Sequence, residues 1–350
     1  MVESIHKPLS PKLQTHEPQH QESQSKLLKN FWYGIEHSAN ISTKPISLTF
    51  MGHDLVLYRG TDGRAIALDG RCVHRGTDLG AGWVEGDCIH CPYHGWKYES
   101  DGVCSHIPAN QPGVTIPKRA KLQSYQVQEK YGLIWLFWGD LPSEQCPPIP
   151  ELPEFEKAGW RTIHGDFDWD GHYSRVIANT IDMAHAPFVH ASAFGKKESP
   201  AVQAYKLESG EWSGSGFITF ETKPAYSLKL ILGKNPPDGI FRATFYMPNV
   251  SRVDLQFGRF QFVLFLVHLP VSDRQTITKW LHIRNFVLTP LADSFMHRDV
   301  VKTFKQDNEA VRIQSGAAPD DLTAEIHAPS DALELAYRKF YNQAVEMGWG

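Results

Sequence analysis

The sequence has 350 residues, a formal net charge of −4 and 41% hydrophobic residues, which together describe a globular chain long enough for two domains. The small negative charge gives no reason to expect a nucleic-acid or anionic-membrane partner. No apolar run reaches the length of a transmembrane helix, and the best candidate, residues 260–269, fits a buried strand better. Because the N-terminus lacks the charged-then-apolar pattern of a signal peptide, we expect a cytoplasmic protein.

The first part of the chain divides into a tail and a strand-rich domain. Residues 1–28 are rich in Gln, Ser, Pro and His without apolar periodicity, which predicts a disordered tail. Residues 29–148 carry strand signals, including a hairpin turn at Thr61-Asp62-Gly63 and a buried strand in "YGLIWLFWG". Prolines then crowd the stretch "DLPSEQCPPIPELPEF" and forbid regular structure, which places a domain boundary near residue 148.

The second part, residues 149–350, is expected to form a sheet followed by helices. Strand-like runs separated by turn residues predict an antiparallel sheet. These runs lie around "GFITFET", "YSLKLIL", "FRATFYM", "FQFVLFLVHLPV" and "ITKWLHIRNFVL". The apolar period then becomes helical in "SFMHRDVVKTFKQDNEAVRIQ" and again in "DALELAYRKFYNQAV". The predicted fold class is α+β, in two domains.

Four residues of the first domain form two similar pairs of metal-binding side chains. Cys72 and His74 form a C-x-H pair, and Cys91 and His94 form a C-x-x-H pair. Such a set could bind zinc, as in a zinc-stabilised binding module. An iron–sulfur centre is favoured because each pair lies between strand signals, as on two facing loops. A glycine shortly after each histidine would also let backbone amides approach the sulfurs of a cluster.

The remaining cysteines are expected to have no cofactor role. Five cysteines are an odd count in a chain too long to need disulfides, which indicates a reducing compartment. Cys88, Cys104 and Cys146 are therefore interpreted as packing thiols.

The segment "NTIDMAHAPFVH" supplies a second set of polar side chains. Asn179, Asp182 and His185 would share one face of a helix, while His190 would point away from it. Pro187 disturbs the helix and allows the chain to bend, so that both imidazoles converge. Two imidazoles suit the site of two histidines and one carboxylate found in mononuclear non-haem iron oxygenases.

The carboxylate of that site is expected on the helix after Pro290. Asp307 lies on the apolar stripe of this helix, where a carboxylate is costly unless a metal or a partner takes it up. Asp299 and Glu309 lie on faces shared with polar side chains, so Asp307 is the predicted ligand. Asp182 is expected to hold the imidazole of His185 in the correct tautomer.

Taken in order, these two sets resemble the signature of Rieske non-haem iron oxygenase α subunits. The resemblance implies an all-β Rieske domain with a [2Fe–2S] cluster on Cys72, His74, Cys91 and His94. It also implies a helix-grip domain with a curved antiparallel sheet and mononuclear Fe(II). Thr77 and Tyr93 stand where respiratory Rieske proteins carry two further cysteines, so the oxygenase or ferredoxin type is the one resembled.

The resemblance also implies partners and an assembly. NAD(P)H would supply electrons through a separate reductase or ferredoxin, and the subunits would form a ring, usually a homotrimer. His94 would hydrogen-bond Asp182 of the next protomer, and Asn179 matches an amide position near the iron. The expected activity is hydroxylation or oxidative demethylation of a small cyclic or aromatic substrate by O₂. The alternative is a Rieske electron-transfer protein whose second domain is not catalytic.

Two local similarities stand out within this family. "DMAHAPFVHASAFGK" is similar to chlorophyllide a and pheophorbide a oxygenases, and "AEIHAPSDALELAYRKF" is similar to soluble cyanobacterial Rieske oxygenases. The chain lacks the C-terminal membrane span of the chlorophyll-related group. The substrate, the reductase and the choice between mono- and dioxygenation are not predicted.

Overall fold

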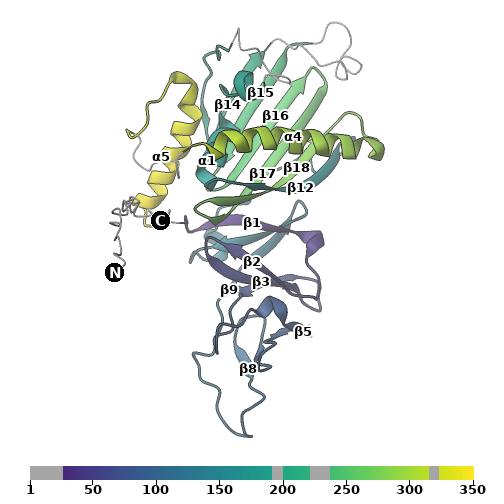
Figure 1. Cartoon of the computed structure of the whole chain (residues 1–350), viewed down its shortest axis with the longest axis vertical. Helices are drawn as coiled ribbons and strands as arrows, with labels where there is room; N and C mark the ends of the chain where they lie inside the picture. Colours follow the sequence, from purple (N-terminus) through teal and green to yellow (C-terminus); the bar gives the residue numbers. More distant parts are fainter. Residues whose placement is uncertain (1–26, 191–199, 221–236, 315–322) are drawn as a thin grey trace, which may run out of the picture.

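The computed structural model describes residues 27–190, 200–220, 237–314 and 323–350 of the chain. It is elongated, with a large sheet at one end and small sheets at the other (Figure 1). Leu28, at the end of the predicted tail, is buried, and its carbonyl oxygen accepts a 2.7 Å hydrogen bond from the Tyr33 hydroxyl. Folded structure therefore includes Leu28, and residues 1–26 of the predicted tail lie outside the described residues.

Three antiparallel sheets make up the N-terminal part of the described chain. The predicted hairpin is present, because β3 (His53–Arg59) and β4 (Ala65–Asp69) pair across the turn in which Gly63 adopts a φ of +81°. The first sheet contains β1 (Phe31–His37), β11 (Leu133–Trp138) and β10 (Val127–Lys130). The second contains β2 (Ile46–Phe50), β3 (His53–Arg59), β4 (Ala65–Asp69) and β9 (Ser124–Tyr125). The third contains β5 (Trp83–Glu85), β6 (Cys88–His90), β7 (Lys97–Tyr98) and β8 (Cys104–His106).

The C-terminal part is built on one antiparallel sheet in the order β12-β18-β17-β16-β15-β14-β13. Its longest strand, β17, is apolar on both faces, which is expected when both faces of a sheet are covered. The strands are β12 (Arg161–Trp169), β13 (Glu208–Ser209), β14 (Ser213–Phe220), β15 (Gly239–Tyr246), β16 (Val250–Phe257), β17 (Phe260–Ser272) and β18 (Gln275–Arg284).

The helices lie mainly on one face of this sheet, and α4 crosses that face diagonally (Figure 1). Leu266 and Trp280 of the sheet pack there against Val176 of α1 and Phe304 of α4. The α-helices are α1 (Tyr173–Ile181), α2 (Ala186–Val189), α4 (Asp293–Arg312) and α5 (Ala332–Glu346). Short 3₁₀ helices span Ser38–Asn40, Leu79–Ala81, Ser143–Gln145, Pro290–Ala292 and Pro329–Asp331.

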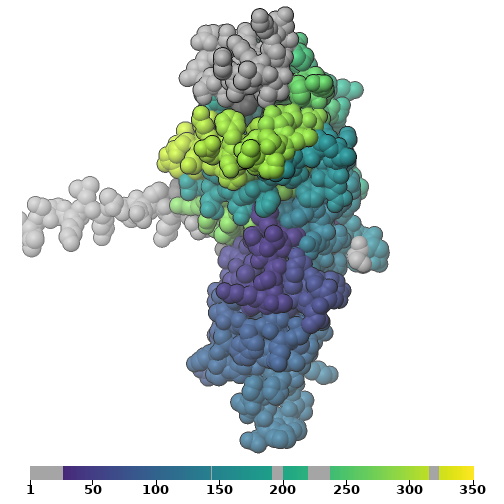
Figure 2. Space-filling model, turned by 90° about the vertical axis from the view of Figure 1, so that its right-hand side faces the viewer, coloured from purple at the N-terminus to yellow at the C-terminus, as the bar shows by residue number. Residues whose placement is uncertain are grey.

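The opposite face of the large sheet packs against the N-terminal part. Phe265 and Leu281 of the sheet share a buried cluster with Trp32 and Trp135, which belong to β1 and β11. This cluster explains why the two parts form one continuous body, narrow at the end that carries β5 to β8 (Figure 2). Ile149, from the proline-rich stretch, is buried in the same cluster.

The predicted fold class is confirmed, and most predicted strands and both long helices are present. The sequence analysis did not identify β12 or β16, in which charged residues break up any continuous apolar run. The predicted strand around "YSLKLIL" lies outside the described residues. None of the described helices has the length and apolar character needed to cross a membrane.

Candidate active site

Two loops with matching backbone hydrogen bonds carry the first set of predicted ligands. After β4, the Cys72 N–H donates to the Thr77 carbonyl (2.9 Å) and the Gly76 N–H donates to the Cys72 carbonyl (2.8 Å). The same two bonds recur around Cys91, at 2.9 Å each. Gly76 and Gly95 both have a φ near +70°, a left-handed conformation that favours glycine. The two loops therefore present their side chains in equivalent ways.

The four predicted cluster ligands divide by burial. Cys72 and Cys91 are buried, with 2% and 1% of their surface exposed, and neither forms a disulfide. His74 and His94 are exposed, and their ring centroids lie 4.7 Å apart. Two buried thiols and two exposed imidazoles form the donor set of a Rieske cluster. In such a cluster the two cysteines bind one iron and the two histidines bind the other. The residues present therefore fit this cofactor.

Aromatic side chains that the sequence analysis did not identify support these ligands. The hydroxyl of Tyr98 lies 3.0 Å from the Cys72 sulfur, and Tyr98 is fully buried. Burial, followed by the contact with Cys72, raises the pKa of Tyr98 well above its usual value, so the hydroxyl stays protonated. Trp96 stacks on the His74 ring at a centroid distance of 4.6 Å. Both residues closely follow Cys91 and His94 in "CPYHGWKY", and this proximity is the feature of the sequence that could have identified them.

The other three cysteines make ordinary packing contacts. The thiol of Cys88 lies 2.9 Å from the Glu99 carboxylate, and burial followed by this carboxylate raises its pKa to about 11. Cys104 and Cys146 contact backbone carbonyl oxygens. None of the five cysteines forms a disulfide in the structure.

The second set of predicted ligands lies where α1 ends and α2 begins. The expected continuous helix through Asn179, Asp182 and His185 is wrong, because α1 ends at Ile181 and Asp182 is extended, with a ψ of 129°. Pro187 lies in the first turn of α2, where a missing N–H has no helical partner to lose. His185 and His190 consequently flank α2 at its two ends, and the convergence comes from a helix break rather than a kink.

Asp307 meets both histidines from α4. The Nε2 atoms of His185 and His190 lie 3.5 and 2.9 Å from the same Asp307 oxygen. Ligands about 2.1 Å from one ion and at right angles to each other are about 3 Å apart, so this spacing fits a single ion. In the described part of the chain, no other His/Cys/Asp/Glu group of three or more meets the spacing expected of single-ion ligands.

Burial and charge act in opposite directions on these side chains. Burial would lower the pKa of His185, but the carboxylates of Asp182 and Asp307 outweigh it and raise that pKa to about 9. Burial would raise the pKa of Asp307, and His185 and His190 lower it instead. Because a histidine must lose its extra proton before it can bind a metal, metal binding at His185 would release a proton.

Three further side chains contact the trio of His185, His190 and Asp307. A carboxylate oxygen of Asp182 lies 3.4 Å from His185 Nδ1, and the Asn179 amide donates to Asp307 at 3.4 Å. The amide oxygen of Gln306, which the sequence analysis did not identify, accepts a 2.9 Å hydrogen bond from His190 Nδ1. Its position next to Asp307 on α4 was the only available signal.

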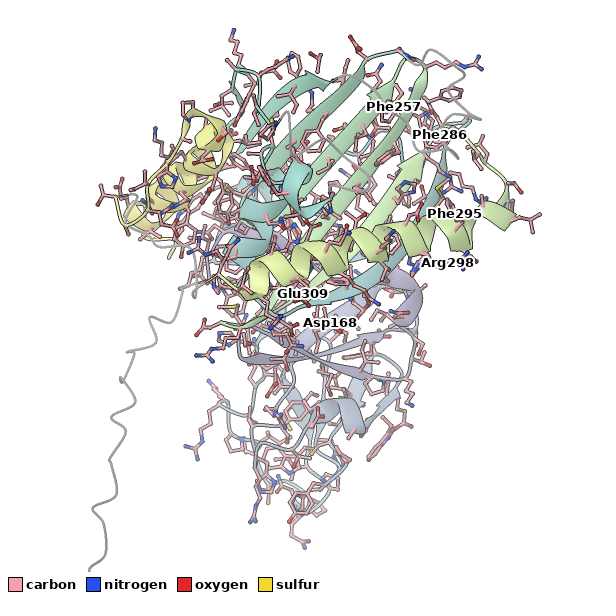
Figure 3. All side chains as sticks on the ribbon, turned by 45° about the horizontal axis from the view of Figure 1, so that its top comes forward. Asp168, Phe257, Phe286, Phe295, Arg298 and Glu309 are labelled. Atoms are coloured by element: carbon pink, nitrogen blue, oxygen red, sulfur yellow. The ribbon has the colours of Figure 1, made fainter. Side chains whose placement is uncertain are left out.

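The two rejected carboxylates of α4 lie away from the trio. Asp299 and Glu309 are exposed, and Glu309 pairs with Arg312. Figure 3 shows Glu309 on the outer side of the C-terminal half of α4. Asp307, by contrast, is buried together with Val300, Phe304 and Val311 on the inner stripe of the helix.

Comparison with known proteins shows the family. Residues 31–126 match the Rieske [2Fe-2S] domain, and residues 169–347 match the vanillate O-demethylase oxygenase C-terminal domain. The second match alone covers more than half of the chain. The chain belongs to the Rieske oxygenases.

Relatives of this Rieske oxygenase include full-length and partial matches. It is 29% identical to aminopyrrolnitrin oxygenase PrnD of Pseudomonas fluorescens, over 90% of this chain and 91% of that protein. It is 34% identical to chlorophyllide a oxygenase of Arabidopsis thaliana, over 48% of this chain and only 30% of that protein. Its fold is similar to Pseudomonas putida NdmA with caffeine, with a TM-score of 0.79, 23% identity and 92% of each chain covered.

Membership of this family establishes the class of reaction. The protein is an oxidoreductase of the non-haem iron family that carries a Rieske [2Fe–2S] cluster and uses O₂ and reductase-supplied electrons to hydroxylate or oxidatively demethylate an organic substrate. The alternative of an electron carrier does not hold, because the second domain matches an oxygenase domain.

Proposed function

We propose that Cys72, His74, Cys91 and His94 hold the [2Fe–2S] cluster and that His185, His190 and Asp307 hold the mononuclear iron. The observation that carries this proposal is the convergence of two imidazole nitrogens on one Asp307 oxygen. An iron held by only these three side chains would keep positions open for dioxygen and substrate. When bound, this iron supplies the oxygen-activating chemistry.

The neighbouring side chains would fix the orientation of the ligands. Asp182 and Gln306 face the Nδ1 atoms of His185 and His190, so each imidazole is left with Nε2 for the metal. The Asn179 amide contacts Asp307 and would orient its carboxylate. The buried surroundings of Asp307 and His190 limit access of bulk water to this site.

A homotrimer is the proposed assembly, with electrons passing from one subunit to the next. Within one chain, the sheet of β5 to β8, whose β6–β7 loop carries Cys91 and His94, lies at the opposite end of the molecule from α1 and α4 (Figure 1). Electron transfer weakens steeply with distance, which favours a path between subunits over one within the chain. The proposed path would run from the exposed His94 of one subunit to Asp182 of the next subunit, which lies beside His185. An NAD(P)H-dependent reductase or ferredoxin would deliver electrons to the cluster.

Oxidative demethylation of a cyclic or aromatic compound is the activity we favour. The C-terminal domain matches that of vanillate O-demethylase, and methylxanthine N3-demethylase NdmB of Pseudomonas putida is 27% identical over 90% of the chain. In such a reaction, one oxygen atom enters the methyl group and the other leaves as water. The hydroxymethyl product then releases formaldehyde.

We further propose that the domains divide near residue 148, as the proline-rich stretch predicts, with a Rieske domain over residues 29–148 and a catalytic domain over residues 149–350. The family matches, at residues 31–126 and 169–347, agree with this division. Five cysteines without a disulfide among them suit a reducing compartment such as the cytoplasm.

The experiment combines the purified protein with a Rieske oxygenase reductase, NADH and ¹⁸O₂. Vanillate, caffeine and dicamba serve as methylated probes, and the same rings without the methyl group serve as controls. The proposal predicts that at least one methylated probe consumes O₂ and releases formaldehyde in equal amounts. Substrate-dependent O₂ uptake that yields a ring-hydroxylated product with its methyl group intact would contradict demethylation.

A further inference from the structure

His282 lies on the sheet face that carries the metal trio. It pairs with Leu264 across β17 and β18, and alternation along β18 places it on the same face as Trp280. Trp280 packs beneath α4, with its ring 6.3 Å from that of Phe304. Asp307 projects from the same buried stripe of α4. His282 therefore faces the interior between the sheet and the iron-binding helices.

On the side toward β16 and β17, the surroundings of His282 on this face are apolar. Val253, Leu255 and Phe257 of β16 form a separate buried cluster, against which Phe262 and Leu264 of β17 also pack. The Phe262 ring lies 5.2 Å from the His282 ring, and the Phe286 ring lies 6.5 Å from that of Phe262. Phe257 and Phe286 lie at the same end of the sheet, on the side where α4 carries Phe295 (Figure 3).

Within this apolar environment, His282 has an unused hydrogen-bonding group. Its exposed fraction is 5%, and its Nδ1 atom is buried without a hydrogen-bond partner among the residues that the structure describes. Native proteins seldom leave a buried polar atom unpaired unless water, an ion or a ligand completes it. Burial, followed by the nearby Arg284, lowers the pKa of His282 to about 3, so the ring is neutral and keeps one N–H to donate.

His268 provides an internal comparison. It is a fully buried histidine on the same face, in β17, with ring nitrogens 2.7 Å from the hydroxyls of Ser251 and Thr278. Both of its nitrogens are thus satisfied within the sheet. A buried histidine in this sheet can thus have both ring nitrogens hydrogen-bonded, so the unpaired Nδ1 atom of His282 reflects its particular position.

The charge near His282 favours a particular kind of ligand atom. Arg284 is fully buried two residues further along β18 and donates to Asp293, while its Nη1 atom has no partner within the described residues. Arg161 also binds Asp293, so two guanidinium groups share one carboxylate. The excess positive charge favours an electron-rich acceptor atom over a donor or a cation.

We propose that His282 is a substrate-binding residue that donates a hydrogen bond to an oxygen acceptor, such as a ring carbonyl, on a planar and otherwise apolar substrate. This inference rests on the proposed function and narrows its substrate class. The apolar side chains of β16 and β17 would contact the ring, and His282 would fix which edge of the ring points away from the iron. Specificity would then depend on the acceptor, because a buried donor left unpaired disfavours analogues that lack it.

The test measures binding of a matched pair of probes to the iron-loaded protein by quenching of tryptophan fluorescence. 1-Methyl-2-quinolone carries a ring carbonyl, and 1-methylnaphthalene has a similar shape without one. The wild type is expected to bind the quinolone about tenfold more tightly or better, the value of one hydrogen bond to a buried donor. His282→Leu should abolish this preference, and His282→Gln should restore part of it.

A second measurement separates substrate binding from a structural role. Because Nδ1 has no partner within the described residues, His282→Leu should leave the melting temperature unchanged or raise it. The matched control His268→Leu breaks two hydrogen bonds and should lower the melting temperature while preserving the preference for the quinolone.

The inference is overturned if the wild type shows no preference for the quinolone, if His282→Leu keeps that preference, or if His282→Leu destabilises the protein as much as His268→Leu. Iron content, measured on the same samples, keeps the two proposals distinguishable. A protein that binds the mononuclear iron but shows no preference for the quinolone contradicts only the role of His282. A protein that never binds it contradicts the proposed function.

Discussion

Asp307 combines two properties that rarely occur together, since it is a carboxylate that is buried on the apolar stripe of an amphipathic helix. Burial of an unpaired charge is costly, so such a residue needs a cation or hydrogen-bond donors nearby. His185, His190 and Asn179 supply these contacts from the α1–α2 segment. The position was predictable from helical periodicity, whereas the partners on a segment more than a hundred residues earlier were not predictable from it.

Asp307→Ala should remove the mononuclear iron and leave the cluster intact. The substitution deletes one of three ligands but touches none of the cluster loops, so turnover should fall by about 100-fold or more. The measurements are iron content, the visible spectrum of the cluster and substrate-dependent O₂ uptake. Glu309→Ala, an exposed carboxylate on the same helix, is the control and should behave as the wild type. Normal turnover in Asp307→Ala would contradict the assignment.

Tyr98→Phe should lower the reduction potential of the cluster. The Tyr98 hydroxyl lies 3.0 Å from the Cys72 sulfur, and a hydrogen bond to a ligand sulfur stabilises the more negative, reduced cluster. We expect a decrease on the order of tens of millivolts, measured by redox titration of the visible spectrum. Tyr93→Phe, which removes an exposed hydroxyl from the same loop, should not change the potential. An unchanged potential in Tyr98→Phe would show that the contact is not a hydrogen bond in the loaded protein.

At the level of elements, the break between α1 and α2 is the feature that sequence reasoning described least well. Periodicity in "NTIDMAHAPFVH" suggested one helix disturbed by Pro187, but the chain leaves the helix at Asp182, five residues earlier. The Asp182 carboxylate accepts a hydrogen bond from the Ala184 N–H, a local turn that competes with helix continuation. The ligand residues were identifiable from their types, while the geometry that unites them depends on this turn and on packing against α4.

The strands also differ in how far the local sequence predicts them. β17 and β18 were predictable because long apolar runs have few alternatives in a chain of this composition. β12 was missed because it has no apolar run: it lies at the sheet edge, and its inward residues alternate with the exposed residues His164, Asp166 and Asp168. His282 was not identified as a candidate either, because only the three-dimensional neighbours reveal that its ring nitrogen is unpaired.

The N-terminus of α4 is fixed to the sheet by charge, which predicts a dependence of stability on pH. Hydrogen bonds from Arg161, followed by those from Arg284, lower the pKa of Asp293 well below its usual value despite partial burial. A carboxyl whose pKa is depressed in the folded state stabilises the protein above its unfolded pKa near 4, and that contribution is lost as the pH falls further.

The melting temperature should therefore fall as the pH is lowered from about 4 toward 2, and the fall should be smaller in Asp293→Asn. Asp168→Asn is the control. Asp168 is an exposed carboxylate of β12, the strand that also carries Arg161, and its substitution should leave the pH dependence of the melting temperature as in the wild type. Differential scanning calorimetry of the metal-free protein gives this comparison without interference from acid-labile clusters. Parallel profiles for the wild type and Asp293→Asn would contradict the role of this ion pair.

For the whole molecule, the elongated shape separates the cluster loops from the metal trio, so assembly is part of the proposed mechanism (Figure 1). Chains that carry His94→Ala should lose the outer cluster ligand, and chains that carry Asp307→Ala should lose the mononuclear iron. Neither variant should turn over alone. Mixed assemblies should regain activity, because the cluster of one subunit can serve the iron of its neighbour. Absence of activity in purified mixed assemblies would indicate that electrons stay within one chain.

The most direct test is the iron content of the reconstituted wild-type chain, measured by emission spectrometry together with Mössbauer spectroscopy after anaerobic loading with ⁵⁷Fe and sulfide. Rieske ligation accounts for two irons and the trio for one more. We predict three irons per chain, two in the signature of a [2Fe–2S] cluster and one as high-spin Fe(II). A chain that loads its cluster fully but takes up no third iron would contradict the account.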